Sequence, residues 1–205
     1  MRSRANDAVD QLPIRLMMSL AIVAAVILLF TAASTTLRTM LAEQVIESQC
    51  RRLESSLSTL AQSGACRDVD DASAPEGTKR VQTFTLPDSL VYLSFGDDPD
   101  PLNTELLSSM LLNDGAVIAY KVQGGSKHVI WLPLETMKFR AGACIDDHWV
   151  IQGTGRNVLI RTGGTVTLVF ERVQKNHECY ILVHTIGERN EDDDSEKFFL
   201  GSLRL

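Results

Sequence analysis

The chain has 205 residues, which leaves room for one domain and an appendage. Its formal net charge is −6 at pH 7. The first 65 residues carry six Lys/Arg and five Asp/Glu, whereas the remaining 140 carry 14 and 21. Because affinity for nucleic acid comes largely from neutralising phosphates, an acidic domain of this kind excludes a nucleic-acid partner.

The most apolar part of the chain lies near its start. Residues 16–34 read LMMSLAIVAAVILLFTAAS, 19 residues without a charge. As a helix that rises 1.5 Å per residue, this segment covers roughly 28 Å, about the thickness of the hydrocarbon core of a bilayer. The pattern predicts a transmembrane helix at 16–34 after a short N-terminal segment at 1–15, with the lipid bilayer as its first partner.

The charges around this span predict its orientation. Arg2, Arg4 and Arg15 precede it, whereas the cations that follow lie farther away and are mixed with glutamates. The positive-inside rule therefore favours a single-pass protein of the cell membrane, with a cytoplasmic N-terminus and an extracytoplasmic C-terminal domain. The alternative is a secretory signal cleaved near residues 31–33. The length of the apolar run and the helical pattern beyond it favour the uncleaved anchor.

A helical pattern continues from residue 35 to 63, without Gly or Pro. Charged residues cover one side, and an apolar stripe whose members step by three or four covers the other. This stripe is the predicted packing face, made of Ile46, Cys50, Leu53, Leu57 and Leu60. We expect one helix from about Leu12 to Gln62. Its packing face contacts either the chain's own domain or, as a coiled coil or filament contact, another copy.

Beyond the amphipathic helix the period changes from helical to alternating. Gly64 is expected to end the helix, and 64–79 is a polar, turn-rich linker. Strands are predicted at 80–86, 90–95, 116–123, 128–132, 148–152, 158–161, 165–173, 180–186 and 198–203. One short helix is predicted at 102–112. The Gly pairs at 124–125 and 163–164 suit hairpin turns.

Short strands at this spacing are typical of an antiparallel sandwich or barrel. The predicted fold class is therefore α+β overall. It combines a long N-terminal transmembrane-plus-amphipathic helix with a mainly antiparallel, β-sandwich-like extracytoplasmic domain at 80–205.

Four cysteines, Cys50, Cys66, Cys144 and Cys179, all follow the span. An even number beyond the membrane fits an oxidising compartment, and four cysteines allow three pairings. A Cys50–Cys66 bond requires the helix to break before Ser63, because an unbroken helix holds Cys50 too far from its end. We therefore prefer a Cys144–Cys179 bridge, with free structural thiols as the alternative.

No cluster of residues predicts catalysis. His148 beside Asp146 and Asp147, and His177 beside Glu178, are weighed as metal ligands, but solvated loops explain them better. Asp97, Asp98 and Asp100 lack the Gly and distal Glu of an EF-hand, and we expect a β-turn with solubilising charge. His184 is predicted to be a core or edge histidine, and Trp131 and Trp149 to be core aromatics. The sequence thus predicts no catalytic residue, cofactor or metal, and no enzyme.

The layout resembles type IV pilin-like proteins: a short basic leader, a hydrophobic helix, its amphipathic continuation and a β-rich head. Residues 8–16 running into 19–22, and 86–88 leading into 91–96, also resemble archaeal single-span membrane proteins with an extracytoplasmic β domain. In pilins the leader is removed beside basic residues, and an acidic residue five positions on pairs with a neighbouring subunit. Cleavage after Ala5 places Asp10 there. However, Asp10, Pro13 and Arg15 interrupt the apolar run, which favours an unprocessed, anchored relative.

These observations predict a non-enzymatic, membrane-anchored envelope protein. Within this class we expect a pilin-like subunit or accessory of a surface filament or secretion system. Its partners would be other membrane or envelope proteins, including copies of itself through the N-terminal helix. The alternative is an anchored extracytoplasmic sensor or ligand-binding module.

Overall fold

A computed structural model describes residues 4–71, 73–104, 115–132, 137–145, 148–151 and 157–186, with only the backbone described for 4–14 and 32. The chain divides into two compact units, Met1–Leu41 and Ala42–Leu205. We call the second unit the head. The first helix, α1, contributes residues to both units.

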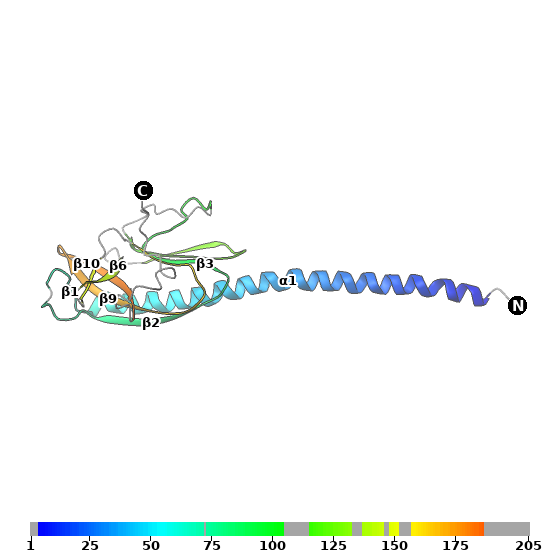
Figure 1. Cartoon of the computed structure of the whole chain (residues 1–205), viewed down its shortest axis with the longest axis horizontal. Helices are drawn as coiled ribbons and strands as arrows, with labels where there is room; N and C mark the ends of the chain where they lie inside the picture. The colour runs from blue at the N-terminus through cyan, green and yellow to red at the C-terminus, as the bar shows by residue number, and fades with distance from the viewer. Residues whose placement is uncertain are drawn as a thin grey trace. The chain divides into compact units, whose positions relative to one another are not determined.

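Helix α1 spans Arg4–Ser63 without interruption, drawn from blue to cyan in Figure 1. It confirms one continuous helix through the apolar and amphipathic segments. The helix begins earlier than predicted, so Pro13 lies inside it rather than in its first turn. At the other end, the amide of Gly64 donates to the carbonyl oxygen of Leu60 at 2.9 Å. The helix therefore ends where glycine was expected to end it.

Ten strands follow among the described residues. They are β1 (Arg67–Asp68), β2 (Lys79–Leu86), β3 (Leu90–Phe95), β4 (Val117–Val122), β5 (Lys127–Trp131), β6 (Lys138–Ile145), β7 (His148–Ile151), β8 (Val158–Ile160), β9 (Gly164–Lys175) and β10 (Glu178–Thr185). Eight of them coincide with predicted strands. The predicted strand at 198–203 lies outside the described residues, as does the predicted helix at 102–112 beyond residue 104.

These strands form two sheets. The first has six strands in the order β1-β9-β10-β6-β7, with β2 also paired to β9, and the second has four in the order β5-β4-β3-β8. Antiparallel pairs predominate, but β1–β9 and β10–β6 are parallel. The α+β class is therefore confirmed. The first sheet is mixed, whereas the second is wholly antiparallel.

Two strands were missed by the sequence analysis, β1 and β6. Strand β6 contains Gly142, which weakens a strand prediction because glycine has no side chain to pack. The structure explains this glycine: a Cβ there would lie 3.2 Å from the Cβ of His184 and from the ring of Trp149. Strand β1 lies in the segment predicted to be a linker, so Arg67 and Asp68 of that segment pair with the first sheet.

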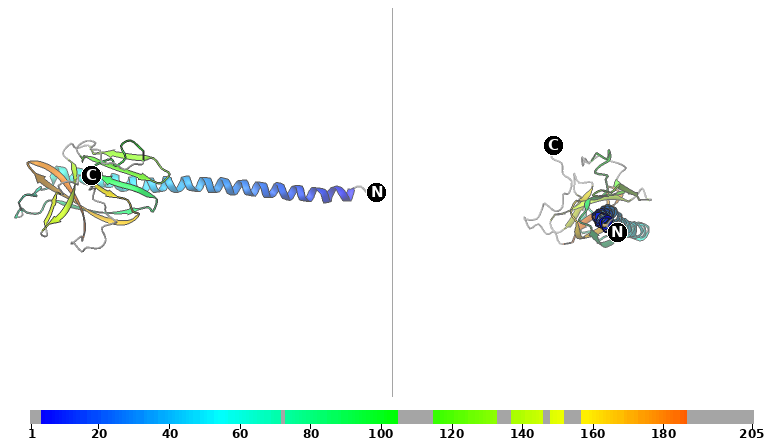
Figure 2. Two further views of the ribbon diagram at one scale, coloured as in Figure 1. Left: turned by 45° about the horizontal axis from the view of Figure 1, so that its top comes forward. Right: turned by 90° about the vertical axis from the view of Figure 1, so that its right-hand side faces the viewer.

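The main apolar cluster of the head draws on the helix and on both sheets, and two small clusters accompany it. In Figure 1 and Figure 2 the cyan part of α1 lies against the strands of the head. Phe95 of β3 contacts Phe139 and Phe170 of the other sheet edge to face, with ring centroids 5.7 and 5.6 Å apart. Trp131, predicted to be a core aromatic, is 50% exposed instead.

Candidate functional site

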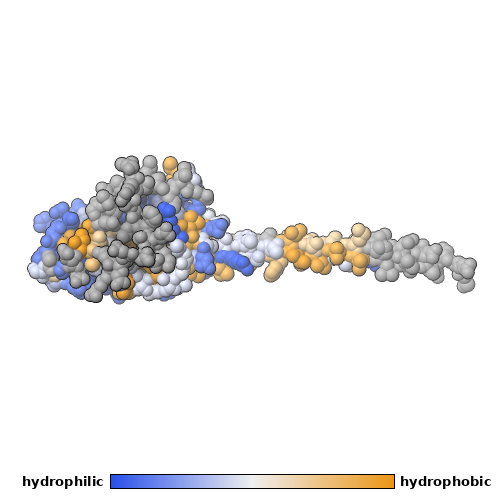
Figure 3. Space-filling view, in the orientation of Figure 1, coloured by the Kyte–Doolittle hydropathy of each residue, from blue (hydrophilic) through white to orange (hydrophobic). Residues whose placement is uncertain are grey.

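The first candidate site is the apolar band on the part of α1 that belongs to the first unit. From Leu16 to Phe30 its large hydrophobic side chains are each 56% to 75% exposed. Figure 3 shows this band as orange atoms along the helix. The chain thus carries a helix long and apolar enough to cross a membrane, with none of its most apolar stretch buried by the protein.

The polar side chains within this band and just after it are hydrogen-bonded to the helix itself. The hydroxyl of Ser19 donates to the carbonyl oxygen of Arg15, that of Thr31 to Leu28, and that of Ser34 to Thr31, at 2.8 to 2.9 Å. In hydrocarbon no water can satisfy such groups, so an internal acceptor removes most of the cost of burying them. The few polar residues of the band are therefore compatible with lipid.

The predicted packing face of α1 lies in the head, and its five residues are all buried. Ile46, Cys50, Leu53 and Leu57 are fully buried, and Leu60 is nearly so. They belong to the same apolar cluster as the phenylalanines of the sheets. This face is therefore occupied by the chain's own head, and a helix from another copy would have to use other positions of α1.

Two polar side chains of α1 also reach the sheets, and neither was singled out from the sequence. The amide of Gln49 bonds the backbone of Thr85 in β2 twice: its Nε2 donates to the carbonyl oxygen at 3.0 Å, and its Oε1 accepts from the backbone amide at 2.8 Å. The carboxylate of Glu43 accepts from the backbone amide of Ser126 at 3.0 Å. The charge pattern assigns Glu43 to the solvent side of the helix, whereas Gln49 lies three residues after Ile46, at the edge of the apolar stripe.

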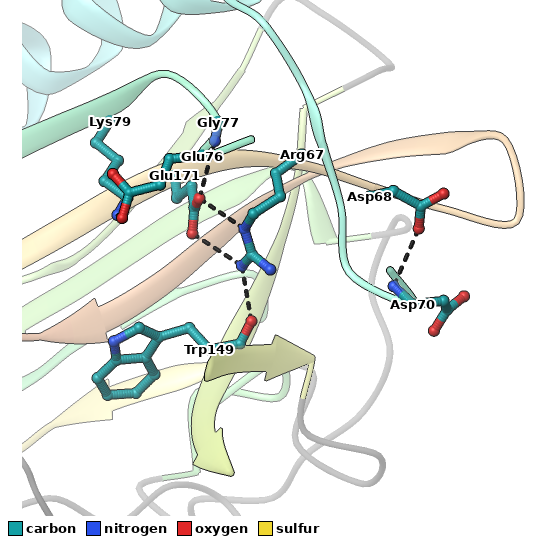
Figure 4. Close-up of polar contacts among 8 residues, drawn as sticks. All are labelled: Arg67, Asp68, Asp70, Glu76, Gly77, Lys79, Trp149 and Glu171. Atoms are coloured by element: carbon teal, nitrogen blue, oxygen red, sulfur yellow. Dashed lines mark hydrogen bonds and ion pairs between the residues drawn. The ribbon is translucent and has the colours of Figure 1, made fainter. Parts of the chain in front are cut away.

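A buried ion pair lies where the chain leaves α1 and enters the first sheet (Figure 4). The guanidinium of Arg67 donates from Nε and Nη2 to the two carboxylate oxygens of Glu171, at 2.8 and 3.0 Å. Its Nη2 also donates to the carbonyl oxygen of Trp149 at 2.7 Å. The backbone amide of Gly77 adds a bond to Glu171 at 3.2 Å. One arginine thus joins β1, β7 and β9.

The surrounding backbone closes this junction further. Arg172 donates from Nη1 to the carbonyl oxygen of Gly64, and Thr78 exchanges bonds with Ala65 in both directions. A side chain at Gly77 would collide with the carbonyl oxygen of Arg172. The two ends of the segment after α1, near Gly64 and near Thr78, are therefore held to the sheet and to each other.

The cysteines do not pair as predicted. All four are free thiols in this structure. The parallel register Ala141↔Val183 places Cys144 three residues beyond it on β6, whereas Cys179 lies at the opposite end of β10. At roughly 3.3 Å per residue the two are about 20 Å apart along the strands, so the preferred Cys144–Cys179 bridge is wrong. Cys179 instead faces Cys66, with the sulfur atoms 3.3 Å apart.

The aspartates of the loop after β3 are buried, which corrects the prediction of a solvated turn. Asp97, Asp98 and Asp100 are at most 4% exposed. Lys127 donates from Nζ to Asp98 at 2.7 Å and to the carbonyl oxygen of Asp100 at 2.6 Å. Lys121 lies 3.9 Å from Asp100. The two lysines of β4 and β5 compensate carboxylates that burial would otherwise destabilise.

A cavity of about 600 Å³ lies beside these charges. It is lined by residues 88–92 with the start of β3, by Asp100 and Lys121, and by the turn at 122–125. The hydroxyl of Tyr92 is buried, and no group in the described part of the chain accepts or donates a hydrogen bond to it. Burial, and then the charges of Asp98 and Asp100, raise the pKa of Tyr92. The hydroxyl therefore stays protonated and able to donate.

The histidines weighed as metal ligands do not gather into a site. Among the described residues, no group of three or more His, Cys, Asp or Glu is placed to hold a metal ion. His148 is exposed, and Asp146 and Asp147 lie outside the described residues. His184 is buried and stacks on Trp149, with ring centroids 3.9 Å apart. Burial lowers the pKa of His184, as expected for a core histidine kept neutral.

Comparisons with protein families, with curated proteins and with solved structures give no match.

Proposed function

We propose that this chain is a non-enzymatic, membrane-anchored envelope protein whose head makes contacts at the cell surface. One observation carries the proposal: a single helix presents an exposed apolar band at Leu16–Phe30 and a buried apolar stripe from Ile46 to Leu60. The band suits lipid, and the stripe suits a protein core. The same helix would therefore be both the anchor and a core element of the head.

The proposed topology is single-pass, with the N-terminus in the cytoplasm and the head outside it. The arginines at 2, 4 and 15 precede the apolar band, and the positive-inside rule places them on the cytoplasmic side. The acidic composition of the remaining chain agrees with this placement, because an anionic inner membrane surface repels an acidic domain.

Within this class we propose a pilin-like architecture, in which a β-sandwich-like head is built on the second half of the anchor helix. The shared cluster of α1 and both sheets supports this arrangement. The charged residues before the band favour an unprocessed anchor over a subunit matured after Ala5. Partners of the head would be other envelope proteins. Self-association would have to use α1 positions outside the buried stripe.

N-terminal sequencing of the protein extracted from membranes tests this proposal. A start at Met1 or Arg2 supports the unprocessed anchor and overturns the alternative of a pilin subunit matured after Ala5. A start at Asn6 supports pilin-like maturation. A start just after residues 31–33 would mean a removed signal, and would overturn the anchor itself.

A ligand-binding module is the second candidate, and the cavity beside Asp100 and Lys121 is the observation that favours it. The cavity lining includes the oppositely charged Lys121 and Asp100, which together suit a small polar ligand or ion. The Tm of the full chain in detergent should then rise with one member of a panel of metals and metabolites, and Lys121→Met should reduce that shift. No shift across the panel counts against this function.

A further inference from the structure

The two sulfur atoms that face each other at 3.3 Å belong to Cys66 and Cys179. Cys66 lies between the end of α1 and β1, and Cys179 is the second residue of β10. Both side chains are partly exposed, so an oxidant can reach them. The residues are 113 positions apart in the sequence, and their contact is a product of the fold.

The sheet register places both cysteines near one end of β9, on or next to strands that pair with its opposite edges. Strand β1 runs parallel to β9 with Asp68 beside Gln174, and β10 runs antiparallel to β9 with Cys179 beside the same Gln174. The two cysteines therefore flank the same end of β9. The buried Arg67–Glu171 pair holds the residue next to Cys66 against β9, which keeps Cys66 in place.

We propose that Cys66 and Cys179 are a disulfide-forming pair. Formation of the bond shortens the distance between the sulfur atoms from 3.3 Å to about 2.05 Å. Each thiol loses its proton, and the two electrons pass by thiol–disulfide exchange to a second disulfide, which is reduced to two thiols. In the cell this step rests on the proposed extracytoplasmic head, because cytosolic thiols are kept reduced. In the purified protein, bond formation does not depend on where the head lies in the cell.

The other cysteines do not compete for this pairing. Cys50 is fully buried in the helix face, and burial raises the pKa of its thiol to about 12, which leaves it unreactive. Cys144 lies on β6 opposite Trp149, at the far end of the sheet from Cys179. These two residues therefore serve as internal controls.

A bond between Cys66 and Cys179 would join the segment that follows the anchor helix to the β9–β10 hairpin. It closes a long loop, for which chain-entropy arguments predict a large gain in stability. Any pull on the anchor would then be passed to the sheet through a covalent link as well as through the Arg67–Glu171 pair. The proposal thus adds a covalent brace to the junction.

The test uses the full chain, purified in detergent and equilibrated with oxidised or reduced glutathione. Alkylation in denaturant and intact mass count the free thiols, and a non-reducing peptide map identifies the linked pair. We expect two thiols to disappear, a peptide linking residues 66 and 179, and a Tm on the order of 10 °C higher after oxidation. Cys144→Ser should behave the same way, whereas Cys66→Ser and Cys179→Ser should remove the redox dependence of Tm.

Four alkylatable thiols after oxidation, or a link that includes Cys144, would overturn the pairing. The same thiol count in cells, trapped by acid quenching, separates the pairing from the topology. A chain that links 66 to 179 in detergent but stays reduced in cells supports the pairing and contradicts the extracytoplasmic placement of the head.

Discussion

The two halves of α1 share one backbone and differ in what their side chains contact. In the first unit the apolar residues surround the helix on all sides and are exposed, as at Leu20 and Phe30. In the head they keep to one stripe, and the stripe is buried in the core. An all-round apolar surface suits hydrocarbon, whereas a stripe suits a protein interior on one side and water on the other. The distribution of apolar residues around a helix thus indicates whether lipid, or protein and water, surround it.

The largest difference in unfolding free energy should appear when one leucine of each half is truncated to alanine. Leu53→Ala removes a fully buried side chain from the core and should lower the free energy of unfolding of the head by about 2–5 kcal/mol. Leu41→Ala, at a position 60% exposed, should change it by less than about 0.5 kcal/mol. Denaturant titration of the full chain in mild detergent, followed by tryptophan fluorescence, measures both. Equal effects would contradict the assignment of the two halves.

A charge placed in the apolar band should separate anchoring from folding. Ile27→Asp puts a carboxylate in the band, close to the middle of the predicted span 16–34, where insertion into a bilayer costs roughly 2.5–3.5 kcal/mol more. We expect a clear loss of flotation with liposomes and an unchanged unfolding of the head. Val81→Asp adds the same charge at an exposed position of β2 and should float like the unchanged chain. If Ile27→Asp also floats fully, the band does not lie in lipid.

A smaller effect is expected at the polar contact between the second half of α1 and the sheet. Gln49→Ala removes both bonds to the backbone of Thr85 and should cost about 1–3 kcal/mol of head stability. Gln62→Ala, at an exposed position near the end of the same helix, is the matched control and should be nearly neutral. Denaturant midpoints of the two variants decide this, and similar values would mean that the Gln49 contacts contribute nothing.

The smallest effect should be a dependence of head stability on pH through His184. Because burial lowers the pKa of His184 in the folded chain, the unfolded chain binds its proton more readily. The stability contributed by His184 is therefore complete above its unfolded pKa, near 6.5, and is lost as pH falls through the folded pKa. Denaturant titrations at pH 7.5 and pH 5 should show a smaller loss of stability in His184→Gln. A loss as large as in the unchanged chain would exclude His184 as its source.

Local pattern was enough to predict much of the fold. The continuous helix, its end at Gly64 and the bounds of β3 follow from period and turn chemistry, which depend on neighbours in the sequence. The stripe from Ile46 to Leu60 was also visible, but its partner was not. The spacing of apolar residues shows that a helix face is buried, but it does not show which part of the protein covers that face.

The parts that the sequence did not predict depend on distant partners. Asp98 looks solvated until Lys127 is known to reach it, and Arg67 looks like a linker residue until Glu171 is placed beside it. The Cys66–Cys179 contact depends in the same way on the register of β1 and β10 against β9. Registers between strands far apart in the sequence are set by tertiary packing, so none of these contacts was available from local pattern.

Alkaline carbonate extraction of membranes that contain the full chain tests the central claim most directly. If one helix both crosses the bilayer and forms the core of the head, the head must stay in the membrane pellet, at the full mass of 22.6 kDa. Release of the head into the supernatant, at full mass or shortened by loss of the apolar band, would contradict the account.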